Sequence, residues 1–419
     1  MRKIYITSAI VAMTITALMT GCGNAITSEK SSASTTKETT ILENSTKTTS
    51  AEIKQLSTST QSDIFTTRDL EQTADVSDSK NITVSDNSTI EITDEGVYTI
   101  SGSAKNCTIK IMADENAKIQ LVLDGISITN SDSPAIYAVS ADKVFITTTD
   151  SENTLTVSGQ FTADGETNTD AVIFSKDDLV LNGTGTLNIT SAYGNGVTSK
   201  DEMKITGGTY NVNTALDAFE ANDAISISDG TFNIATNKDG FHCENDEAEG
   251  SITIMGGTFI INAESDGIRA TSLLRIDGGT FDITASEGLE ATYVLINDGN
   301  ITIYGSDDGI NASSKTNSCE TAIEINGGDL DVSVGQGDTD AIDSNGSIYV
   351  NGGTINVTAQ MSSFDYDLSA EFNGGTIIIN GSEVSEIPQS MMGGGMHGGM
   401  EGGMNGEMND FGGGRGRRV

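Results

Sequence analysis

Apolar and polar residues alternate in short segments from residue 76 onward, and turns rich in Gly, Asn and Asp separate these segments. This period of two is typical of β-strands and excludes helices of ordinary length. One phrase returns nine times: apolar strand residues, a glycine corner, then Thr-aromatic-x-aliphatic. Such a short repeat predicts stacked units that bury their apolar faces against one another. The corner glycines, 20 to 29 residues apart, are Gly185, Gly208, Gly230, Gly257, Gly279, Gly299, Gly328, Gly353 and Gly375.

A complete repeat holds three short strands, as in residues 266–270, 274–277 and 280–284. We therefore predict an all-β fold, a single-stranded parallel β-helix of about 11–12 coils over residues 76–390. Its corners need residues with positive φ, which glycine adopts without strain. Stacking brings equivalent positions of successive coils about 4.8 Å apart. One predicted interior column is Tyr210, Phe232, Phe259, Phe281, Ile301, Leu330, Ile355 and Ile377.

The two flanks differ from the repeats in composition. Residues 1–22 begin with Arg2 and Lys3, continue with an apolar run and end in Gly-Cys, a pattern that predicts an export signal. The ending resembles a bacterial lipobox, in which Cys22 is lipidated; a signal peptide cleaved elsewhere is the alternative. Residues 23–75, rich in Ser and Thr, predict a disordered tether. The chain is thus expected to be a membrane lipoprotein on the extracellular face.

Residues 391–419 are rich in Gly and Met and predict a disordered tail. Its methionines recur every four residues around His397, and thioethers suit Cu(I), so loose metal capture is an alternative to a plain low-complexity segment. The formal net charge of the chain is −38, and almost all of it falls on residues 76–390. A surface this acidic excludes nucleic acid as a partner.

The acidic residues recur at one repeat position, immediately before the third strand. Stacked carboxylates repel one another, which raises their proton affinity unless cations lie between them. Oxygen-rich turns of this kind suit Ca²⁺, so we predict a calcium-binding column. The alternative is a solvated acidic edge, because Asp is a good turn residue in its own right. The predicted metal ligands are Asp217, Asp239, Asp266, Glu287, Asp308 and Asp340, with Asp307 beside them.

A second column follows within the same strands and should face outward, because its members alternate with inward apolar positions. Arg269 lies between His242 and Glu290 in this column, where it could neutralise Glu290 or bind a ligand carboxylate. A surface ion pair is the simpler interpretation. The predicted ligand-binding residues are Glu220, His242, Arg269, Glu290, Asn311 and Asp343, with Thr198 preceding them.

These motifs together resemble the calcium-dependent carbohydrate-binding β-helix family of bacterial surface lipoproteins. The resemblance covers roughly residues 80–385 and is carried by VYTISG (97–102), QLVLDGISITNSDSPAIYA (120–138), SKDDLVLNGTGTLNI (175–189) and the D-G-I-x-A turns. It implies a right-handed, pectate-lyase-like β-helix that binds acidic or cellulosic plant polysaccharides. By the same resemblance, residues 80–175 belong to this domain.

Three functions remain open on the sequence. The leading hypothesis is a non-catalytic surface protein that binds a polysaccharide through Ca²⁺, since the chain has no Trp for a stacking platform. The second is a polysaccharide lyase, which would need Ca²⁺ and a basic side chain, with Arg269, Lys238 and Lys315 as candidates. The third is an adhesin or spacer with protein partners, because β-helices host several roles.

Overall fold

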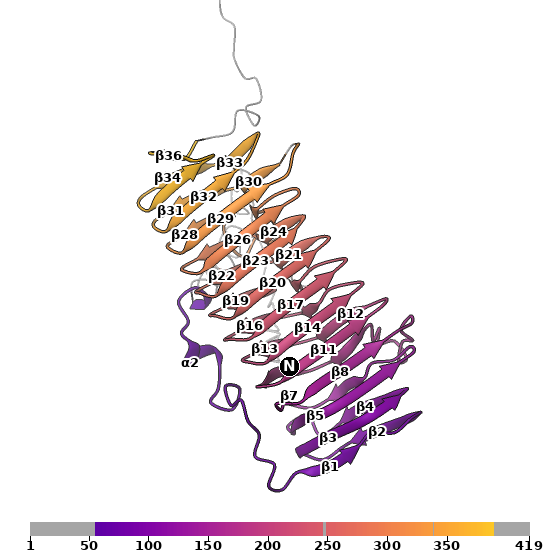
Figure 1. Ribbon diagram of the computed structural model, residues 1–419. Helices are drawn as coiled ribbons and strands as arrows, with labels where there is room; N and C mark the ends of the chain where they lie inside the picture. The colour runs from indigo at the N-terminus through magenta and orange to yellow at the C-terminus, as the bar shows by residue number, and fades with distance from the viewer. Residues whose placement is uncertain (1–54, 246–248, 338, 389–419) are drawn as a thin grey trace, which may run out of the picture.

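The computed structural model describes residues 55–245, 249–337 and 339–388, which form a solenoid of parallel β-strands (Figure 1). The predicted parallel β-helix is confirmed, and its 12-stranded sheet takes one strand from each coil. The expected signal peptide, Cys22, residues 23–54 of the tether and the tail from 391 lie outside the described residues. In the part of the chain that the structure covers, no helix has the length and apolarity that a membrane span requires.

Each coil contributes a strand to three faces, here called faces one, two and three. Face one is the 12-stranded sheet. Its strands are β2 (Ser88–Ile92), β4 (Cys107–Met112), β6 (Ile136–Ser140), β9 (Ala171–Ser175), β12 (Asn195–Ser199), β15 (Phe219–Ala221), β18 (Phe241–Cys243), β21 (Asp266–Ala270), β24 (Glu287–Ala291), β27 (Ile310–Ala312), β30 (Asp340–Ser344) and β33 (Ser362–Tyr366).

Faces two and three are joined into one sheet by two long strands that bend from one face to the other. Face two holds β1 (Lys80–Thr83), β3 (Gly96–Lys105), β5 (Lys118–Asn130), β7 (Lys143–Thr148), β10 (Asp178–Gly183), β13 (Glu202–Ile205), β16 (Ala224–Ile227), β19 (Ser251–Ile254), β22 (Leu273–Ile276), β25 (Tyr293–Ile296), β28 (Ala322–Ile325), β31 (Ser347–Val350) and β34 (Ser369–Phe372). Face three holds the ends of β3 and β5 with β8 (Glu152–Val157), β11 (Thr186–Ser191), β14 (Thr209–Thr214), β17 (Thr231–Thr236), β20 (Thr258–Ala263), β23 (Thr280–Ala285), β26 (Asn300–Gly305), β29 (Asp329–Val334), β32 (Thr354–Thr358) and β35 (Thr376–Ile379); β36 (Ser382–Val384) pairs antiparallel with β35.

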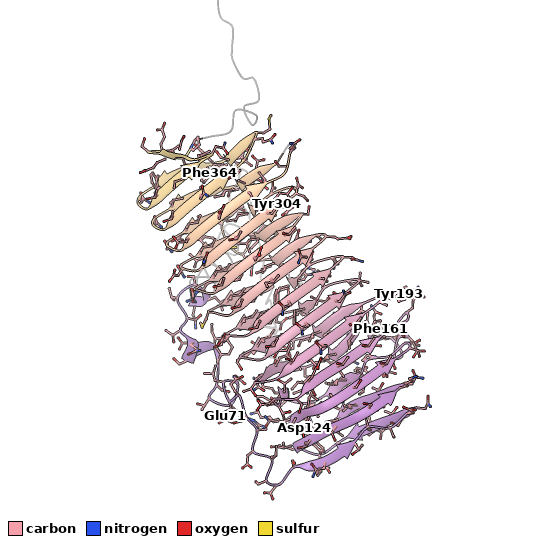
Figure 2. The ribbon with its side chains drawn as sticks, viewed as in Figure 1. Glu71, Asp124, Phe161, Tyr193, Tyr304 and Phe364 are labelled. Atoms are coloured by element: carbon pink, nitrogen blue, oxygen red, sulfur yellow. The ribbon has the colours of Figure 1, made fainter. Side chains whose placement is uncertain are left out.

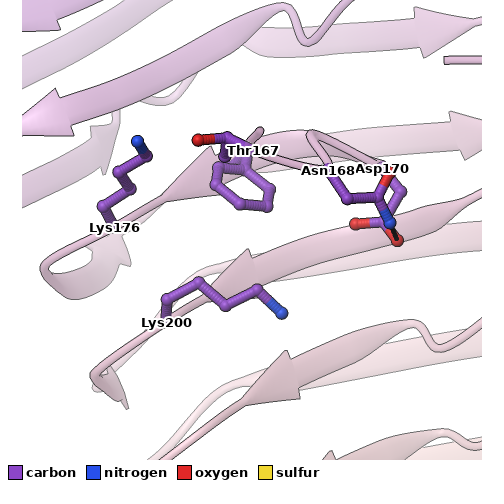
Figure 3. A pocket seen from close by; sticks show the side chains of 6 residues that line it. Thr167, Asn168, Asp170, Lys176 and Lys200 are labelled. Carbon is purple, nitrogen blue, oxygen red and sulfur yellow. Dashed lines mark hydrogen bonds between the residues drawn. The ribbon is translucent and has the colours of Figure 1, made fainter. Parts of the chain in front are cut away.

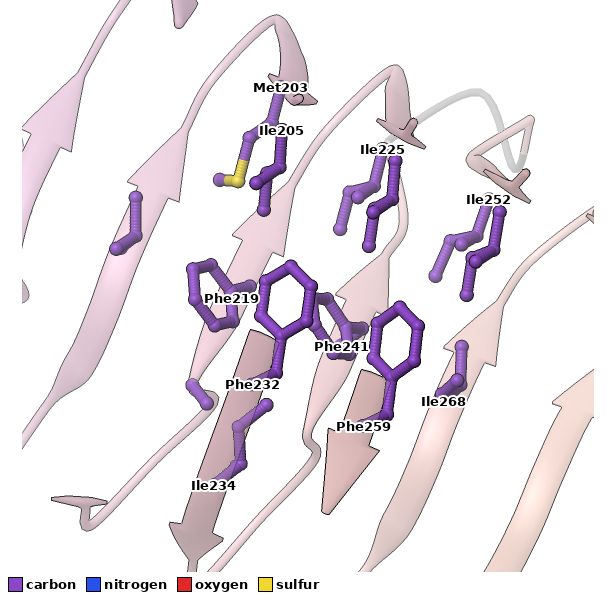
Figure 4. Close-up of a cluster of buried hydrophobic side chains, with 14 of the residues drawn as sticks. Met203, Ile205, Phe219, Ile225, Phe232, Ile234, Phe241, Ile252, Phe259 and Ile268 are labelled. Atoms are coloured by element: carbon purple, nitrogen blue, oxygen red, sulfur yellow. The ribbon is translucent and has the colours of Figure 1, made fainter. Parts of the chain in front are cut away.

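The predicted interior column is confirmed, because all eight of its members are buried. Its rings stack face to face, with centroids 4.7 Å apart for Phe232 and Phe259 and 4.5 Å apart for Phe259 and Phe281. A second stack, Phe219 on Phe241, meets the first stack edge-on (Figure 4). Stacked and edge-to-face pairs are the favoured aromatic geometries. They hold successive coils in vertical register, which also aligns the polar positions on the outside.

The glycine corners follow the prediction at eight of nine positions, where φ is positive, as at Gly257 and Gly279 (110° each). Gly185 is the exception, and the expectation of a positive φ was wrong there. In that coil the left-handed residue is Gly183, with φ of 113°. Gly185 is required for space instead, since a Cβ at this position would collide with the carbonyl oxygen of Thr149.

Residues 55–75, which composition placed in the disordered tether, pack against face two, so this part of the prediction needs correction (Figures 1 and 2). The segment contains the short helix α2 (Gln61–Ile64). Phe65 is buried after it, and Arg275 donates hydrogen bonds to the carbonyl oxygens of Leu56 (2.6 Å) and Ser59 (2.9 Å). Contacts to side chains more than 200 residues away leave no trace in local composition, which is why the sequence analysis missed them.

Candidate functional site

The acidic column, defined as Asp217, Asp239, Asp266, Glu287, Asp308 and Asp340, lies at the corner that leads into face one. Successive members are one coil apart, and in three of the pairs the carboxylate of one member accepts the backbone N–H of the next. The Asp217 carboxylate accepts the N–H of Asp239 (3.1 Å), and the Asp239 carboxylate accepts the N–H of Asp266 (3.0 Å). Asp308 accepts the N–H of Asp340 in the same way (3.0 Å). An acidic residue at this position therefore has a structural role, since it satisfies a buried donor of the next coil.

In Asp217, Asp239 and Asp308 this pattern uses Oδ1 and leaves Oδ2 for another partner. Oδ2 of Asp239 is buried and accepts no hydrogen bond within the described residues, and neither does Oδ1 of Asn311. A buried acceptor without a partner costs about 1–3 kcal/mol. His242 Nδ1 lies 3.6 Å from Asp239 Oδ2 and offsets part of this cost there. A cation beside Asn311 Oδ1 would remove the cost at that position, so this part of the corner fits a bound ion.

The first cluster at this corner is Asp217, Asp239 and His242, whose ligand atoms lie within 4.8 Å of one another. Lys238 Nζ lies 2.8 Å from Asp217 Oδ2, and His242 Nδ1 lies 3.3 Å from the same oxygen. Burial opposes ionisation, but hydrogen bonds from His242 and Lys238 lower the pKa of Asp217. Burial likewise disfavours the imidazolium, yet the bond to Asp217 raises the pKa of His242. The cluster thus contains its own cations.

The second cluster is Asp266, Glu287 and Glu290, which offers only carboxylate oxygens within 4.8 Å of one another. Arg269 Nε lies 3.4 Å from Glu290 Oε2, and Lys315 Nζ lies 2.5 Å from Glu290 Oε1. Both cations are thus closest to Glu290. Burial and then the charge of Glu290 raise the pKa of Glu287 to about 7, while burial and Asp239 raise the pKa of Asp266. The corner is short of positive charge here.

The shortage continues in the next coils. Burial, followed by the charges of neighbouring acids, raises the pKa of Asp308 and of Asp343 to about 7 each. Within the described ranges no Lys, Arg or His forms an ion pair with either side chain. Asp307 is exposed and belongs to neither cluster of ligand atoms. Negative charge without a partner therefore accumulates toward the C-terminal coils.

The second predicted column also exists, because its residues pair one after another on face one: Glu220 with His242, His242 with Arg269, Arg269 with Glu290, Glu290 with Asn311, and Asn311 with Asp343. Its predicted exposure was wrong in part, since Thr198, Glu290 and Asn311 are buried. The side chains turn toward the acidic column: Asn311 donates a hydrogen bond to Glu287 (3.0 Å). The two predicted columns thus form a single site, and the expected Arg269–Glu290 ion pair is part of it.

The three candidate bases of a lyase are all held by carboxylates. Lys238 pairs with Asp217, Arg269 with Glu290 and Asp266, and Lys315 with Glu290. Although burial opposes it, the hydrogen bond to Asp217 raises the pKa of Lys238. The charge of Glu290 has the same effect on the pKa of Arg269, again against burial. A general base must lose its proton near the working pH, and the contacts of Lys238 and Arg269 favour their protonated forms.

The sequence analysis missed the upstream part of the site. Asp170 and Asn195 continue the acidic column, since the Asp170 carbonyl accepts the N–H of Asn195 (2.7 Å) and Asn195 Oδ1 accepts the N–H of Asp217 (2.9 Å). Tyr137 and Phe174 continue the outer row as an edge-to-face pair with centroids 5.8 Å apart. The apolar residues after Asp170 align with the third strand of later repeats, and this alignment could have identified Asp170. No local sequence signal indicates that Tyr137 and Phe174 lie on the outer side of face one.

The fold and this corner define a β-helix protein with a row of stacked carboxylates on one face. The chain belongs to the family of carbohydrate-binding domain-containing proteins, whose family model matches residues 86–341 and 293–407. A carbohydrate-binding domain-containing protein of Acetivibrio thermocellus is 34% identical over 128 residues, 29% of this chain, and the match spans 44% of that relative's length. A solved structure described as the polysaccharide lyase-like protein from C. thermocellum, a gadolinium derivative, is 22% identical with a TM-score of 0.33 and covers 74% of this chain and 96% of that one. The predicted membership in a carbohydrate-binding family is confirmed, whereas calcium dependence and lipid modification stay predictions.

Proposed function

We propose that this protein binds an acidic polysaccharide through Ca²⁺ held at the acidic column, and that it does not cleave the polymer. The observation that supports the proposal most is the second cluster. Asp266, Glu287 and Glu290 form a buried or half-buried set of oxygen ligands, and the pKa values of Asp266 and Glu287 are raised. Carboxylates that repel one another in this way gain the most from a divalent cation between them.

Calcium takes six to eight oxygen ligands in loose geometry, so protein carboxylates need fill only part of its coordination shell. A bound ion of this kind would leave positions for the carboxylate of a uronic acid residue. In this arrangement the side chains of face one hold the ion, and the ion neutralises both partners. This explains how a chain with a net charge of −38 could hold an acidic glycan.

The column is not uniform in its fitness for Ca²⁺. Asp217 and Asp239 already have Lys238 and His242 beside them, and an imidazole nitrogen is a poor calcium ligand. Asp266, Glu287 and Glu290 fit best, and the coils with Asp308, Asp340 and Asp343 offer a further oxygen-rich position. Asp307 is exposed and lies outside both clusters of ligand atoms, so it would contact a bound ion only from the solvent side. We therefore place the main calcium sites in the C-terminal half of the column.

A non-catalytic role is supported by the ion pairs that favour the protonated forms of Lys238 and Arg269, and by the pairing of Lys315 with Glu290. The alternative is a lyase that works by calcium-assisted β-elimination. A lyase turns polygalacturonate into unsaturated products that absorb in the ultraviolet. We expect no sustained, calcium-dependent rise in that absorbance, and such a rise would establish the alternative.

The location proposed from the sequence is the outer face of the cell membrane, with Cys22 as the lipid-modified residue and a plant cell-wall glycan as the partner. Metabolic labelling with a radioactive fatty acid tests the anchor: the label should appear in the wild-type protein and be absent from a Cys22→Ser variant. An adhesin with protein partners would instead bind cell-surface protein and no glycan on an array.

The deciding experiment measures binding to polygalacturonate, cellulose and a neutral soluble glycan, each with Ca²⁺ and with excess EDTA. We expect polygalacturonate to bind much more tightly with Ca²⁺ than with excess EDTA. The control variant, Glu383→Gln, removes an exposed carboxylate on β36 and should behave as the wild type. Binding to polygalacturonate that is indifferent to EDTA would refute the calcium-dependent mode.

A further inference from the structure

A pocket of about 330 Å³ opens on the outer side of face one, upstream of the acidic column. Residues 158–170 connect β8 to β9, and Thr167, Asn168 and Asp170 of this connection form one wall of the pocket beside Phe174. The pocket lies outside both clusters of acidic ligands. Its lining residues are Thr167, Asn168, Asp170, Phe174, Lys176 and Lys200 (Figure 3).

The wall of this pocket is fixed by several contacts to the coils. The N–H of Thr162 donates to the carbonyl oxygen of Asp132 (2.8 Å), and Thr169 Oγ1 donates to the carbonyl oxygen of Thr162 (3.1 Å). Lys110 Nζ lies 3.0 Å from Asp164 Oδ2. Gly194 lets the wall approach the next coil, since a Cβ there would collide with the Asp170 carbonyl. The pocket is therefore part of the folded protein in the absence of a ligand.

Two lysines and one aspartate give the lining of the pocket a positive formal charge, whereas the chain as a whole is acidic. Lys176 and Lys200 follow β9 and β12, so they enter from successive coils. Lys200 forms an ion pair with Glu220, with 3.3 Å between Nζ and Oε1. In the ranges that the structure describes, no ion pair joins Lys176 to a carboxylate. The one carboxylate in the lining, Asp170, accepts a hydrogen bond from Asn168 Nδ2 (2.6 Å). Burial, then the charge of Glu220, raises the pKa of Asp170.

We propose that this pocket binds the carboxylate of one uronic acid residue without a metal ion, with the ammonium groups of Lys176 and Lys200 as the anion site. This inference rests on the proposed function, because it concerns the same acidic glycan. The Thr167 hydroxyl and the Asn168 amide provide hydrogen bonds for sugar hydroxyls, and the Phe174 ring provides an apolar contact.

The position of the pocket agrees with a glycan that runs along the solenoid axis. Phe174 pairs with Thr198, Thr198 with Glu220, and Glu220 with His242 on face one. The pocket thus lies in the same row as the predicted ligand-binding column, a few coils before the calcium-binding coils. One glycan could reach both the pocket and the calcium sites, with its carboxylates bound by lysine at one end and through calcium at the other.

The test measures binding of tri-galacturonate to the full chain by calorimetry, once in excess EDTA and once with millimolar Ca²⁺. The wild-type protein should keep weak binding in EDTA, and Lys176→Gln should weaken that binding about tenfold, the effect of one charge-assisted hydrogen bond. The matched control is Lys118→Gln, which removes a lysine charge beside Asp142, away from the pocket. This control should leave binding in EDTA unchanged.

Several outcomes would overturn the proposal. These are no binding in EDTA, an equal loss in the Lys176 and Lys118 variants, equal binding of a neutral galactose trimer, or full displacement by an equal concentration of inorganic phosphate. Calcium-dependent binding that persists in these cases would leave the proposed function standing. If the protein binds tri-galacturonate neither in EDTA nor with Ca²⁺, the proposed function itself is refuted. If Lys176→Gln does not fold, Asn168→Ala provides a second variant that removes a predicted hydrogen bond to the sugar and keeps the charge.

Discussion

The replacement Glu287→Gln separates a calcium ligand from an ordinary acidic residue, because the two roles predict effects of opposite sign. In the metal-free protein, Glu287 is crowded by Glu290 and accepts a hydrogen bond from Asn311. A glutamine keeps the shape and an oxygen that can accept this bond, but it removes the charge. The variant should therefore be more stable than the wild type without calcium and should bind calcium more weakly.

The size of the effect follows from the pKa of Glu287, which is about 7 compared with 4.5 for an unperturbed glutamic acid. At about 1.4 kcal/mol for each pKa unit, ionisation of Glu287 would cost roughly 3 kcal/mol above pH 7, and solvent screening of this partly exposed group reduces the cost to about 2 kcal/mol. Removing the charge should raise Tm by about 4 °C at pH 8. The gain should shrink at about pH 5, where the folded protein already holds the proton.

The assay is thermal unfolding of the wild type and the variant at both pH values, with EDTA and with Ca²⁺. At a calcium concentration one hundred times the wild-type Kd, the wild type should gain about 2.7 kcal/mol and a variant with tenfold weaker binding about 1.4 kcal/mol. The exposed control Glu383→Gln should match the wild type throughout. A lower Tm of Glu287→Gln in EDTA at pH 8, or an equal calcium response in both proteins, would refute this reasoning.

Three further predictions concern titration, the core and the N-terminal segment. Because the pKa values of Asp308 and Asp343 are raised to about 7, the folded metal-free protein holds protons that the unfolded chain releases. Its stability should therefore fall as pH rises from about 4 to 7, and its calcium affinity, measured by calorimetry, should rise over about pH 6 to 8. A flat pH profile of either quantity would contradict this. Phe259→Ala removes the ring between Phe232 and Phe281 and should cost about 3–5 kcal/mol, seen as a lower urea midpoint; a cost below about 1 kcal/mol would show that the stack does not hold the coils. Phe65→Ala should release residues 55–75 from face two, so limited proteolysis should cut there faster while the urea midpoint of the coils changes little; unchanged proteolysis would contradict this docking role.

The coil architecture was predictable because its determinants are local. Each strand has its own period-two pattern, and each corner contains a glycine with positive φ, so both signals lie within a few residues of sequence. Aromatic residues such as Phe232 and Phe259 recur at the same place in each repeat, so the vertical register could be read from the sequence. The register then placed the acidic column correctly.

The chemistry of the site was less predictable because it depends on which cation reaches which acid. Lys315 lies in a connection 25 residues after Glu290, and only the path of that connection brings the two together. The same holds for Lys238, which contacts Asp217 in the preceding coil. The backbone hydrogen bonds accepted by Asp217 and Asp239 require stacked coils, and no pattern in one repeat indicates them.

The segments outside the repeats were the hardest to place. Residues 55–75 resemble the tether in composition, yet they dock through Phe65 and through backbone carbonyls bound by Arg275. Residues 158–170 form a pocket wall by contacts with Lys110 and Asp132 in earlier coils. Such contacts join parts of the chain that share no repeat, so a periodic pattern carries no information about them.

The most direct test of calcium-mediated glycan binding is the anomalous difference density of crystals grown with calcium and oligogalacturonate. The account predicts a calcium peak among the carboxylates of Asp266, Glu287 and Glu290, with a uronate oxygen among its ligands. A sugar bound on another face, or a well-ordered corner that contains only water, would contradict it.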